Sequence, residues 1–269
     1  MAGKMLWAAS WLGAAAVAQQ QSVYSIEKES ALGRQLAAEF RGRTESVESS
    51  AALAYVSAIG QRLVAETKGP PWTYRFALIA DDPTAMHEPA AFPGGFVFVP
   101  ASLILAAREE GELAGMLAHA IAHVAARDGT RSPPRPEAGA PLRTPLIFRG
   151  AWTGYASPRG SAPALPIGML ELLRQFELEA DRMATRVMSD AGWNPEALAR
   201  YIEREQPADE GASKAWSALP SLSRRVDALR EAIAGMPSRA YVRHEGLQSV
   251  QQEIRGLLRS GKTPPALRR

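Results

Sequence analysis

The sequence predicts an α+β protein that is mainly helical, with a small β-sheet beside one central helix. Several segments carry apolar residues at helical spacing, and only two short runs have the pattern of strands. A content of 46% hydrophobic and 22% charged residues is typical of a globular chain. With 269 residues in the chain, we expect one substantial domain over residues 19–260.

The composition excludes several kinds of site. The chain has no cysteine, which rules out disulfides, thiolate metal sites and a cysteine nucleophile. Its formal charge of +3 is spread without a long basic block, so nucleic acid is not an expected partner. Imidazole ligands are scarce, because the only histidines are His87, His119, His123 and His244.

Residues 1–18 have the pattern of a secretory signal peptide. Lys4 supplies the positive charge, residues 5–17 form an apolar run too short to span a bilayer comfortably, and Ala-Val-Ala at 16–18 offers a cleavage site. An uncleaved anchor or a buried helix is the alternative interpretation. We expect export, with a periplasmic or secreted chain that begins after Ala18.

The chain then alternates between helices and strands. Helical spacing predicts two amphipathic helices over residues 25–41 and 47–67, to which we assign only packing. Pro70-Pro71 ends the second helix, and residues 74–80 have the pattern of a strand.

A second strand is predicted where a Pro-Gly-Gly turn leads into alternating aromatic and valine residues, from Phe92 to Val99. Two interpretations remain open for this strand. It is either an internal hairpin strand or an edge on which an extended peptide pairs. In the second case the substrate strand comprises Gly94, Gly95, Phe96, Val97 and Phe98.

The central helix is predicted over residues 112–127, which contain no proline. It places His119 and His123 four residues apart, so both imidazoles leave one face and suit one metal ion. In the H-E-x-x-H motif of metallopeptidases, the two histidines bind zinc and the glutamate is the general base. Ala120 occupies the position of that glutamate, so the sequence keeps the ligands and lacks the base.

Residues 129–167 interrupt the helical pattern with frequent Pro, Gly and Ser. We expect a flexible flap near the metal site, because so long a structureless segment within a compact domain is usually a lid or a binding loop. Tyr155 and Arg159 are weak candidates to face a substrate carbonyl. His244 lies in a polar run and reads as a solvated histidine.

Helix resumes over residues 169–189, where Glu177 and Asp181 are four apart and share a face. Asn194-Pro195 opens another helix, and two more are predicted over residues 222–234 and 246–259. Residues 261–269 have no core-forming pattern and form a loose tail.

The carboxylates on this second helix complete a plausible metal site. Two histidines need at least one further protein ligand to hold zinc with an open catalytic position. Glu177 fits that role, and Asp181 can accept the N–H of a ligating imidazole and fix its tautomer. We therefore expect one zinc ion per chain.

At these residues the sequence resembles the gluzincin metallopeptidases, a family that includes HtpX-like, BepA-like and CAAX prenyl endopeptidase proteins. The likeness covers about residues 50–235 and includes the two ligand helices, the Pro-Gly-Gly strand and the late segment 218–226. It implies a zincin-like domain with a peptide or unfolded-protein substrate and peripheral association with a membrane. Ala120 departs from the family pattern, as do Leu219, where many relatives carry His, and Glu88-Pro89, where Asn-Ala is usual.

The sequence thus predicts a zinc metalloendopeptidase-type protein that acts on unfolded or envelope proteins. As written it is weakly active or inactive, because losing a general base costs about a hundredfold to ten-thousandfold in rate. The alternative is a zinc-retaining pseudoprotease that binds or chaperones exported proteins. A plain helical domain without metal is a third interpretation.

Overall fold

The computed structural model describes residues 22, 24–80, 87–130, 167–206, 219–241 and 245–260. The expected signal peptide, the loose tail, residues 131–166 of the expected flap, and His244 lie outside these ranges. The described elements, in chain order, are α1 (Ile26–Arg41), α2 (Ser50–Ala65), β1 (Arg75–Ile79), β2 (Ala90–Phe92), β3 (Phe96–Pro100), α3 (Ala101–Ala106), α4 (Glu110–Ala125), the 3-10 helix η1 (Asp128–Thr130), α6 (Ile167–Asp190), α7 (Glu196–Glu205), α8 (Leu222–Ala234) and α9 (Leu247–Arg259).

This architecture confirms the predicted mainly helical α+β class with a small sheet. Every helix predicted with both ends is present, and the ends shift by three residues at most. Polar side chains fix several starts: Ser49 accepts a hydrogen bond from the Ala52 N–H, and Ser221 accepts one from Arg224. None of the helices in the described ranges is long and apolar enough to cross a membrane.

The sheet has the strand order β1-β3-β2, with β1 parallel and β2 antiparallel to β3. Because β3 is hydrogen-bonded on both sides, it is an internal strand. The interpretation of Gly94, Gly95, Phe96, Val97 and Phe98 as a substrate-binding edge is therefore wrong. The outer strands of the described sheet are β1 and β2.

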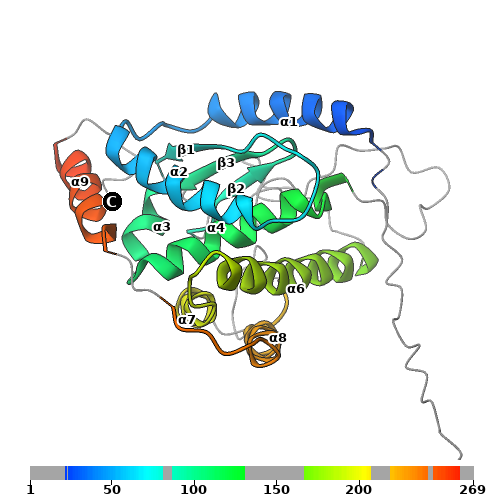
Figure 1. Cartoon of the computed structure of the whole chain (residues 1–269). Helices are drawn as coiled ribbons and strands as arrows, with labels where there is room; N and C mark the ends of the chain where they lie inside the picture. The colour runs from blue at the N-terminus through cyan, green and yellow to red at the C-terminus, as the bar shows by residue number, and fades with distance from the viewer. Residues whose placement is uncertain are drawn as a thin grey trace, which may run out of the picture.

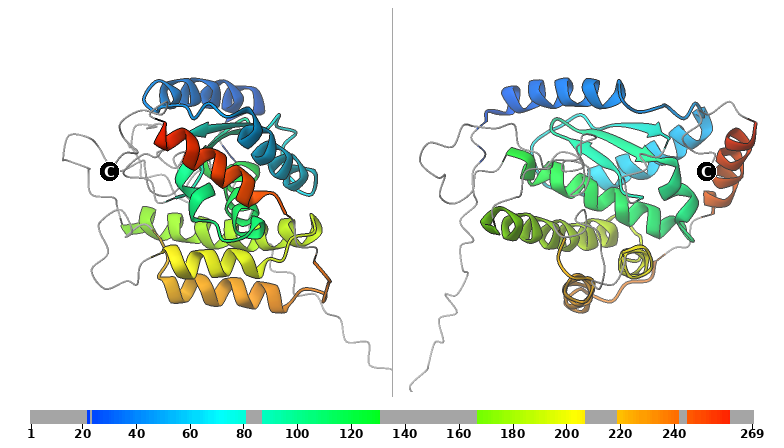
Figure 2. Two further views of the ribbon diagram at one scale, coloured as in Figure 1. Left: turned by 90° about the vertical axis from the view of Figure 1, so that its left-hand side faces the viewer. Right: turned by 180° about the vertical axis from the view of Figure 1, so that it is seen from behind.

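The sheet lies between helices (Figures 1 and 2). Helix α1 runs along one face, α2 and α4 pack on the other side, and α6 packs against α4 with α7 and α8 beneath. Helix α9 closes one end against α2 and α3. Helix α4 is therefore central, and the element that carries the two candidate histidine ligands is enclosed by the rest of the fold.

The alternating residues of β3 explain these layers. Val97 and Val99 join the large core shared with α2 and α4, whereas Phe98 points to the other face and packs with Phe40 of α1. The rings of Phe40, Phe92 and Phe98 have centroids 5.0–5.7 Å apart, which is the favoured range for aromatic pairs. Burial on both faces makes β3 the rigid centre of the sheet.

Candidate metal centre

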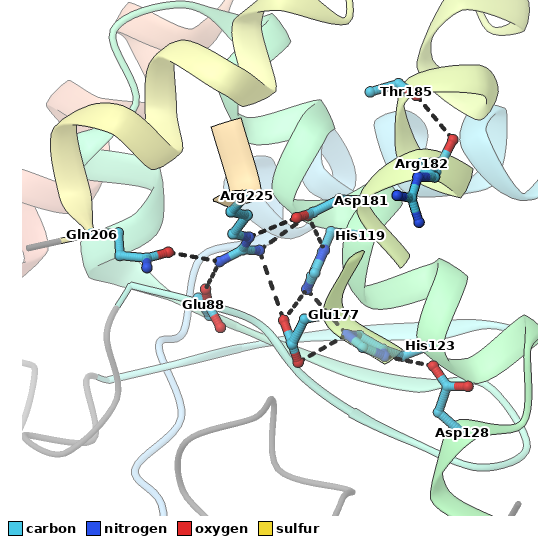
Figure 3. A network of polar contacts seen from close by, with 10 residues as sticks. All are labelled: Glu88, His119, His123, Asp128, Glu177, Asp181, Arg182, Thr185, Gln206 and Arg225. Atoms are coloured by element: carbon cyan, nitrogen blue, oxygen red, sulfur yellow. Dashed lines mark hydrogen bonds and ion pairs between the residues drawn. The ribbon is translucent and has the colours of Figure 1, made fainter. Parts of the chain in front are cut away.

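Helix α4 presents the two histidines to one point. All its residues except Gly111 and His123 are buried, as expected for a helix with packing partners on every side. The four-residue spacing brings Nε2 of His119 and Nε2 of His123 to 3.1 Å, with the rings nearly perpendicular (Figure 3). Two nitrogens that bind one tetrahedral zinc ion lie roughly 3.3 Å apart, so this separation fits a shared ion.

Helix α6 supplies the carboxylate that faces them. Glu177 is 2% exposed; its Oε2 lies 3.3 Å from His119 Nε2 and its Oε1 lies 3.4 Å from His123 Nε2. The ligand atoms of these three residues all lie within 4.8 Å of one another. The structure therefore brings together the three residues that the sequence nominated as metal ligands.

A buried carboxylate orients each imidazole. Asp181, one turn after Glu177, accepts a hydrogen bond from His119 Nδ1 at 2.8 Å, the role expected for it from the sequence. Asp128, in the turn after α4, accepts one from His123 Nδ1 at 2.7 Å. With both Nδ1 atoms donating, each neutral imidazole has its lone pair on Nε2, the atom that faces Glu177.

Arg225 of α8 is the buried cation of the site (Figure 3). Its Nε and one terminal nitrogen donate to the two oxygens of Asp181 at 2.6 and 3.1 Å. The guanidinium also lies 3.8 Å from both Glu177 and Glu88. Arg225 thus holds Asp181 in the orientation that serves His119.

The pKa values follow from these contacts. Burial acts against protonation of His123, but Glu177 and Asp128 outweigh it and raise the pKa to about 10. The pKa of His119 is also raised, since Asp181 and Glu177 outweigh burial. Burial acts against ionisation of Glu177, but His123 and His119 hold its pKa well below the ordinary value. For Asp181, Arg225 and His119 likewise overcome burial and lower the pKa.

Charge balance explains why the imidazoles attract protons. Four carboxylates, from Glu88, Asp128, Glu177 and Asp181, face the single guanidinium of Arg225 within this network. With neutral histidines the network carries three excess negative charges. Two protons on the histidines, or one divalent cation, reduce that excess to one, so protons and a metal ion compete for the same position.

The residues fit a zinc ion by two observations independent of the motif. Glu177 Oε2 is buried and has no hydrogen-bond partner among the described residues; Arg225 lies 3.8 Å from it, too far for a hydrogen bond, so this oxygen keeps a lone pair that a metal ion can take. The two Nε2 lone pairs also converge on each other, an arrangement that repels unless a proton or a cation lies between them. Two imidazoles and a carboxylate are a donor set that zinc favours.

Two residues that sequence reasoning marked as departures occupy defined places. Ala120 is buried beside His119 and brings no carboxylate to the site. Leu219 is buried, and its backbone carbonyl accepts a hydrogen bond from Arg174 Nε at 3.2 Å. Its apolar side chain has no atom that could bind a metal.

Sequence reasoning missed Asp128 and Arg225. Asp128 had a usable signal, since it is an acidic residue placed just beyond the helix end, five positions after His123. Arg225 lay in the late segment already associated with the gluzincins, but no spacing rule connects it to Asp181, which is 44 residues earlier.

A helix that presents two histidines to a glutamate on a second helix, beside a small sheet, defines the zincin-like class of peptidase folds. Residues 50–233 match the sequence profile of peptidase family M48, and the chain belongs to this family. The match extends over more than half of the chain.

Individual relatives agree with this assignment. The chain is 28% identical over 190 residues to the beta-barrel assembly-enhancing protease of Escherichia coli K12 and 27% identical over 187 residues to that of Yersinia pestis. These matches cover 68% and 67% of the chain but 38% of each relative, so the chain spans well under half of their length. The mitochondrial metalloendopeptidase OMA1 of Schizosaccharomyces pombe is 31% identical over 183 residues, covering 66% of this chain and 52% of that protein.

Proposed function

We propose that this chain is a zinc-binding metalloendopeptidase-type protein that holds unfolded or envelope polypeptides and cleaves them slowly. The observation that carries the proposal is the convergence of His119, His123 and Glu177 within 4.8 Å, each imidazole being oriented by a buried aspartate. The proposed substrate class rests on relatives that are named beta-barrel assembly-enhancing protease.

Each residue of the centre has a distinct task in this proposal. His119, His123 and Glu177 hold the ion; Asp181 and Asp128 fix the imidazole tautomers; Arg225 fixes Asp181 and balances charge. When bound, zinc supplies Lewis-acid chemistry that activates water and polarises a peptide carbonyl. Position 120 is where the family places the proton acceptor, and alanine cannot accept a proton.

We propose that the substrate backbone binds along the outer strand β2. Among the described residues β2 pairs only with β3, and we assign its other edge to an extended peptide. A cavity of about 20 Å³ lies between this strand and the metal helix, lined by Ala91 and Pro93 on one side and His123 and Asp128 on the other. A peptide paired with β2 would therefore pass beside His123.

Ala120 favours a second candidate function, that of a zinc-retaining binding protein without turnover. Zinc content measured on the purified full chain tests both, with about one ion per chain expected and little in the His123→Ala variant. Equal zinc in the two proteins would refute the metal assignment. If zinc is present, binding of a labelled unfolded protein with no cleavage over many hours would favour the binding protein over the slow peptidase.

A further inference from the structure

Helix α1 carries a buried carboxylate that the proposed zinc chemistry does not use. Glu29 is 1% exposed, and its Oε2 accepts a hydrogen bond from Arg127 Nε at 2.6 Å. Its Oε1 accepts one from Thr130 Oγ1 at 2.8 Å. Arg127 also donates to the backbone carbonyl of Tyr24 at 2.6 Å, so the segment before α1 is held by the same guanidinium.

These contacts hold the turn that follows the metal helix. Arg127 has φ +60°, a left-handed conformation that favours glycine after a helix and strains other residues. An arginine at such a position indicates that its side chain is needed there. The Thr130 N–H donates to the Arg127 carbonyl at 2.9 Å and closes the turn. Glu29 therefore hydrogen-bonds to the residue at each end of this turn.

Asp128 lies between those two ends. It is fully buried, and its Oδ2 accepts the His123 Nδ1 hydrogen bond at 2.7 Å. The position of this carboxylate depends on the backbone of residues 127–130, because an aspartate side chain is too short to compensate for a displaced turn. Glu29 therefore acts on His123 through the turn and through Asp128.

Glu29 itself is fixed by the way α1 packs. A Cβ on Gly33 would lie 1.8 Å from the Pro93 carbonyl oxygen, so α1 rests directly on the turn between β2 and β3. Phe40, about two turns beyond Gly33 on α1, packs with Phe92 and Phe98 of the sheet. Glu29 is thus presented from a rigid helix that lies outside the family-matched residues 50–233.

We propose that Glu29 is a positioning residue of the metal centre, which sets the orientation of His123 by clamping Arg127 and Thr130 around Asp128. This inference rests on the proposed zinc function for its consequence, but the hydrogen bond that it concerns joins two side chains of the chain itself. It also makes α1 a required part of the centre.

Nuclear magnetic resonance of the full chain, labelled with ¹⁵N-histidine, tests the inference without metal. The four histidines give few signals, and His119, held by Asp181, is an internal control. In Glu29→Ala the Nδ1 signals of His123 should shift and lose the signature of a strong hydrogen bond, while the Nδ1 signals of His119, which Asp181 holds, should change much less. Thr130→Val, which removes one donor at nearly constant volume, should cause a smaller change in the same direction if Glu29→Ala folds poorly.

Zinc affinity gives the second measurement. Glu29→Ala should lower the zinc affinity by about tenfold, the low end of the range for residues that orient ligands. In a chain that already carries Asp128→Asn, Glu29→Ala should change the zinc affinity by less than about twofold. Glu110→Gln is the matched control: it alters a buried carboxylate at the opposite end of α4, bonded to Tyr55 and Trp193, and should leave the histidine signals and the affinity unchanged.

Equal shifts of His119 and His123, shifts of neither, or the same response to Glu110→Gln would overturn the positioning role. Equal affinity losses with and without Asp128→Asn would also overturn it. A chain that binds no zinc at all would refute the proposed function, and the histidine signals would then still decide the role of Glu29.

Discussion

In the proposed function, Ala120 limits the rate of hydrolysis at this centre. It follows His119 on α4, is buried, and does not belong to either apolar core cluster of the described residues. A carboxylate at this position is the component that the peptidase mechanism requires and the chain lacks.

We expect Ala120→Glu to leave zinc binding nearly unchanged and to raise peptide hydrolysis by about a hundredfold or more, the usual scale of general-base assistance. Single-turnover cleavage of an unfolded protein at equal zinc occupancy measures the gain. Ala120→Gln has the same volume without the base and should show no gain. If Ala120→Glu is no faster than the original chain, the binding protein becomes the better account.

The two orienting aspartates should respond differently to substitution. Asp181→Asn should weaken zinc binding by about tenfold to a hundredfold and also destabilise the protein, by about 3–5 kcal/mol, because it leaves the buried Arg225 without its main partner. Asp128→Asn should weaken zinc binding on the same scale with a smaller loss of stability, since its hydrogen bond goes to His123, which is less buried than Arg225.

Chelator competition measures the zinc affinity of these two variants, and chemical denaturation of the metal-free proteins measures their free energies of unfolding. Equal losses of stability in the two variants would contradict the role assigned to Arg225.

At the residue scale, helical periodicity paired His119 with His123 and Glu177 with Asp181, and the ligand requirement of zinc together with the gluzincin resemblance joined the two pairs. All four residues lie within helices, where the spacing along the sequence determines from which side of the helix each side chain leaves. Asp128 lies in a turn, and the site of Arg225 depends on how α8 packs on α6, so neither follows from a period. Glu29 is further removed still, because it reaches the centre across a long sequence gap.

Helix α1 is an element whose position depends on the absence of a side chain. Gly33→Ala should lower the free energy of unfolding by about 1–3 kcal/mol, because the new methyl group would overlap the Pro93 carbonyl. Gly256→Ala on α9 is the matched control, since nothing lies within 4 Å of its added Cβ, and it should gain up to about 1 kcal/mol from helix propensity. Denaturant unfolding of the two variants checks this; a neutral Gly33→Ala would mean that α1 is not packed closely on the turn.

At the element scale, the sequence was a good guide to helices and a poor guide to sheet order. Caps and apolar periods specify where α2 and α8 begin and end, since these signals are local. Strand order depends on pairing between distant segments, and the alternation in β3 is the same for an internal strand and an edge. For that reason residues 94–98 were compatible with an internal strand and with an edge, and the structure gives β1 and β2 as the outer strands.

The whole molecule should respond to pH in opposite directions with and without zinc. Because the pKa of His123 is raised to about 10, protonation of His123 stabilises the metal-free protein. This contribution is complete at pH values below the ordinary pKa of 6.5 and is lost as the pH rises toward 10. The lowered pKa values of Glu177 and Asp181 contribute stability above their ordinary values, which is lost as the pH falls through the folded pKa. Zinc requires deprotonated imidazoles, so its binding is favoured where the metal-free protein weakens.

We therefore expect zinc affinity to rise by about tenfold to a hundredfold per pH unit near neutrality, corresponding to the release of one or two protons. Zinc should accordingly raise the melting temperature more at about pH 8.5 than at about pH 6. Competition with a chelator of known proton affinity and thermal unfolding at both pH values provide the measurements. An affinity that does not change with pH would mean that the histidines are neutral in the metal-free chain.

The contact between α9 and α3 has a consequence for biosynthesis. Gln251 Nε2 donates to the backbone carbonyls of Ile104 and Ala107 at 2.8 and 2.7 Å, and the first of these lies 147 residues earlier in the chain. At about 5–20 residues per second, the ribosome adds Gln251 roughly 7–30 s after the carbonyls that it binds. The described residues of the metal centre, up to Arg225, are all synthesised before α9. Translation order therefore allows the centre to assemble before α9 closes the α3 end.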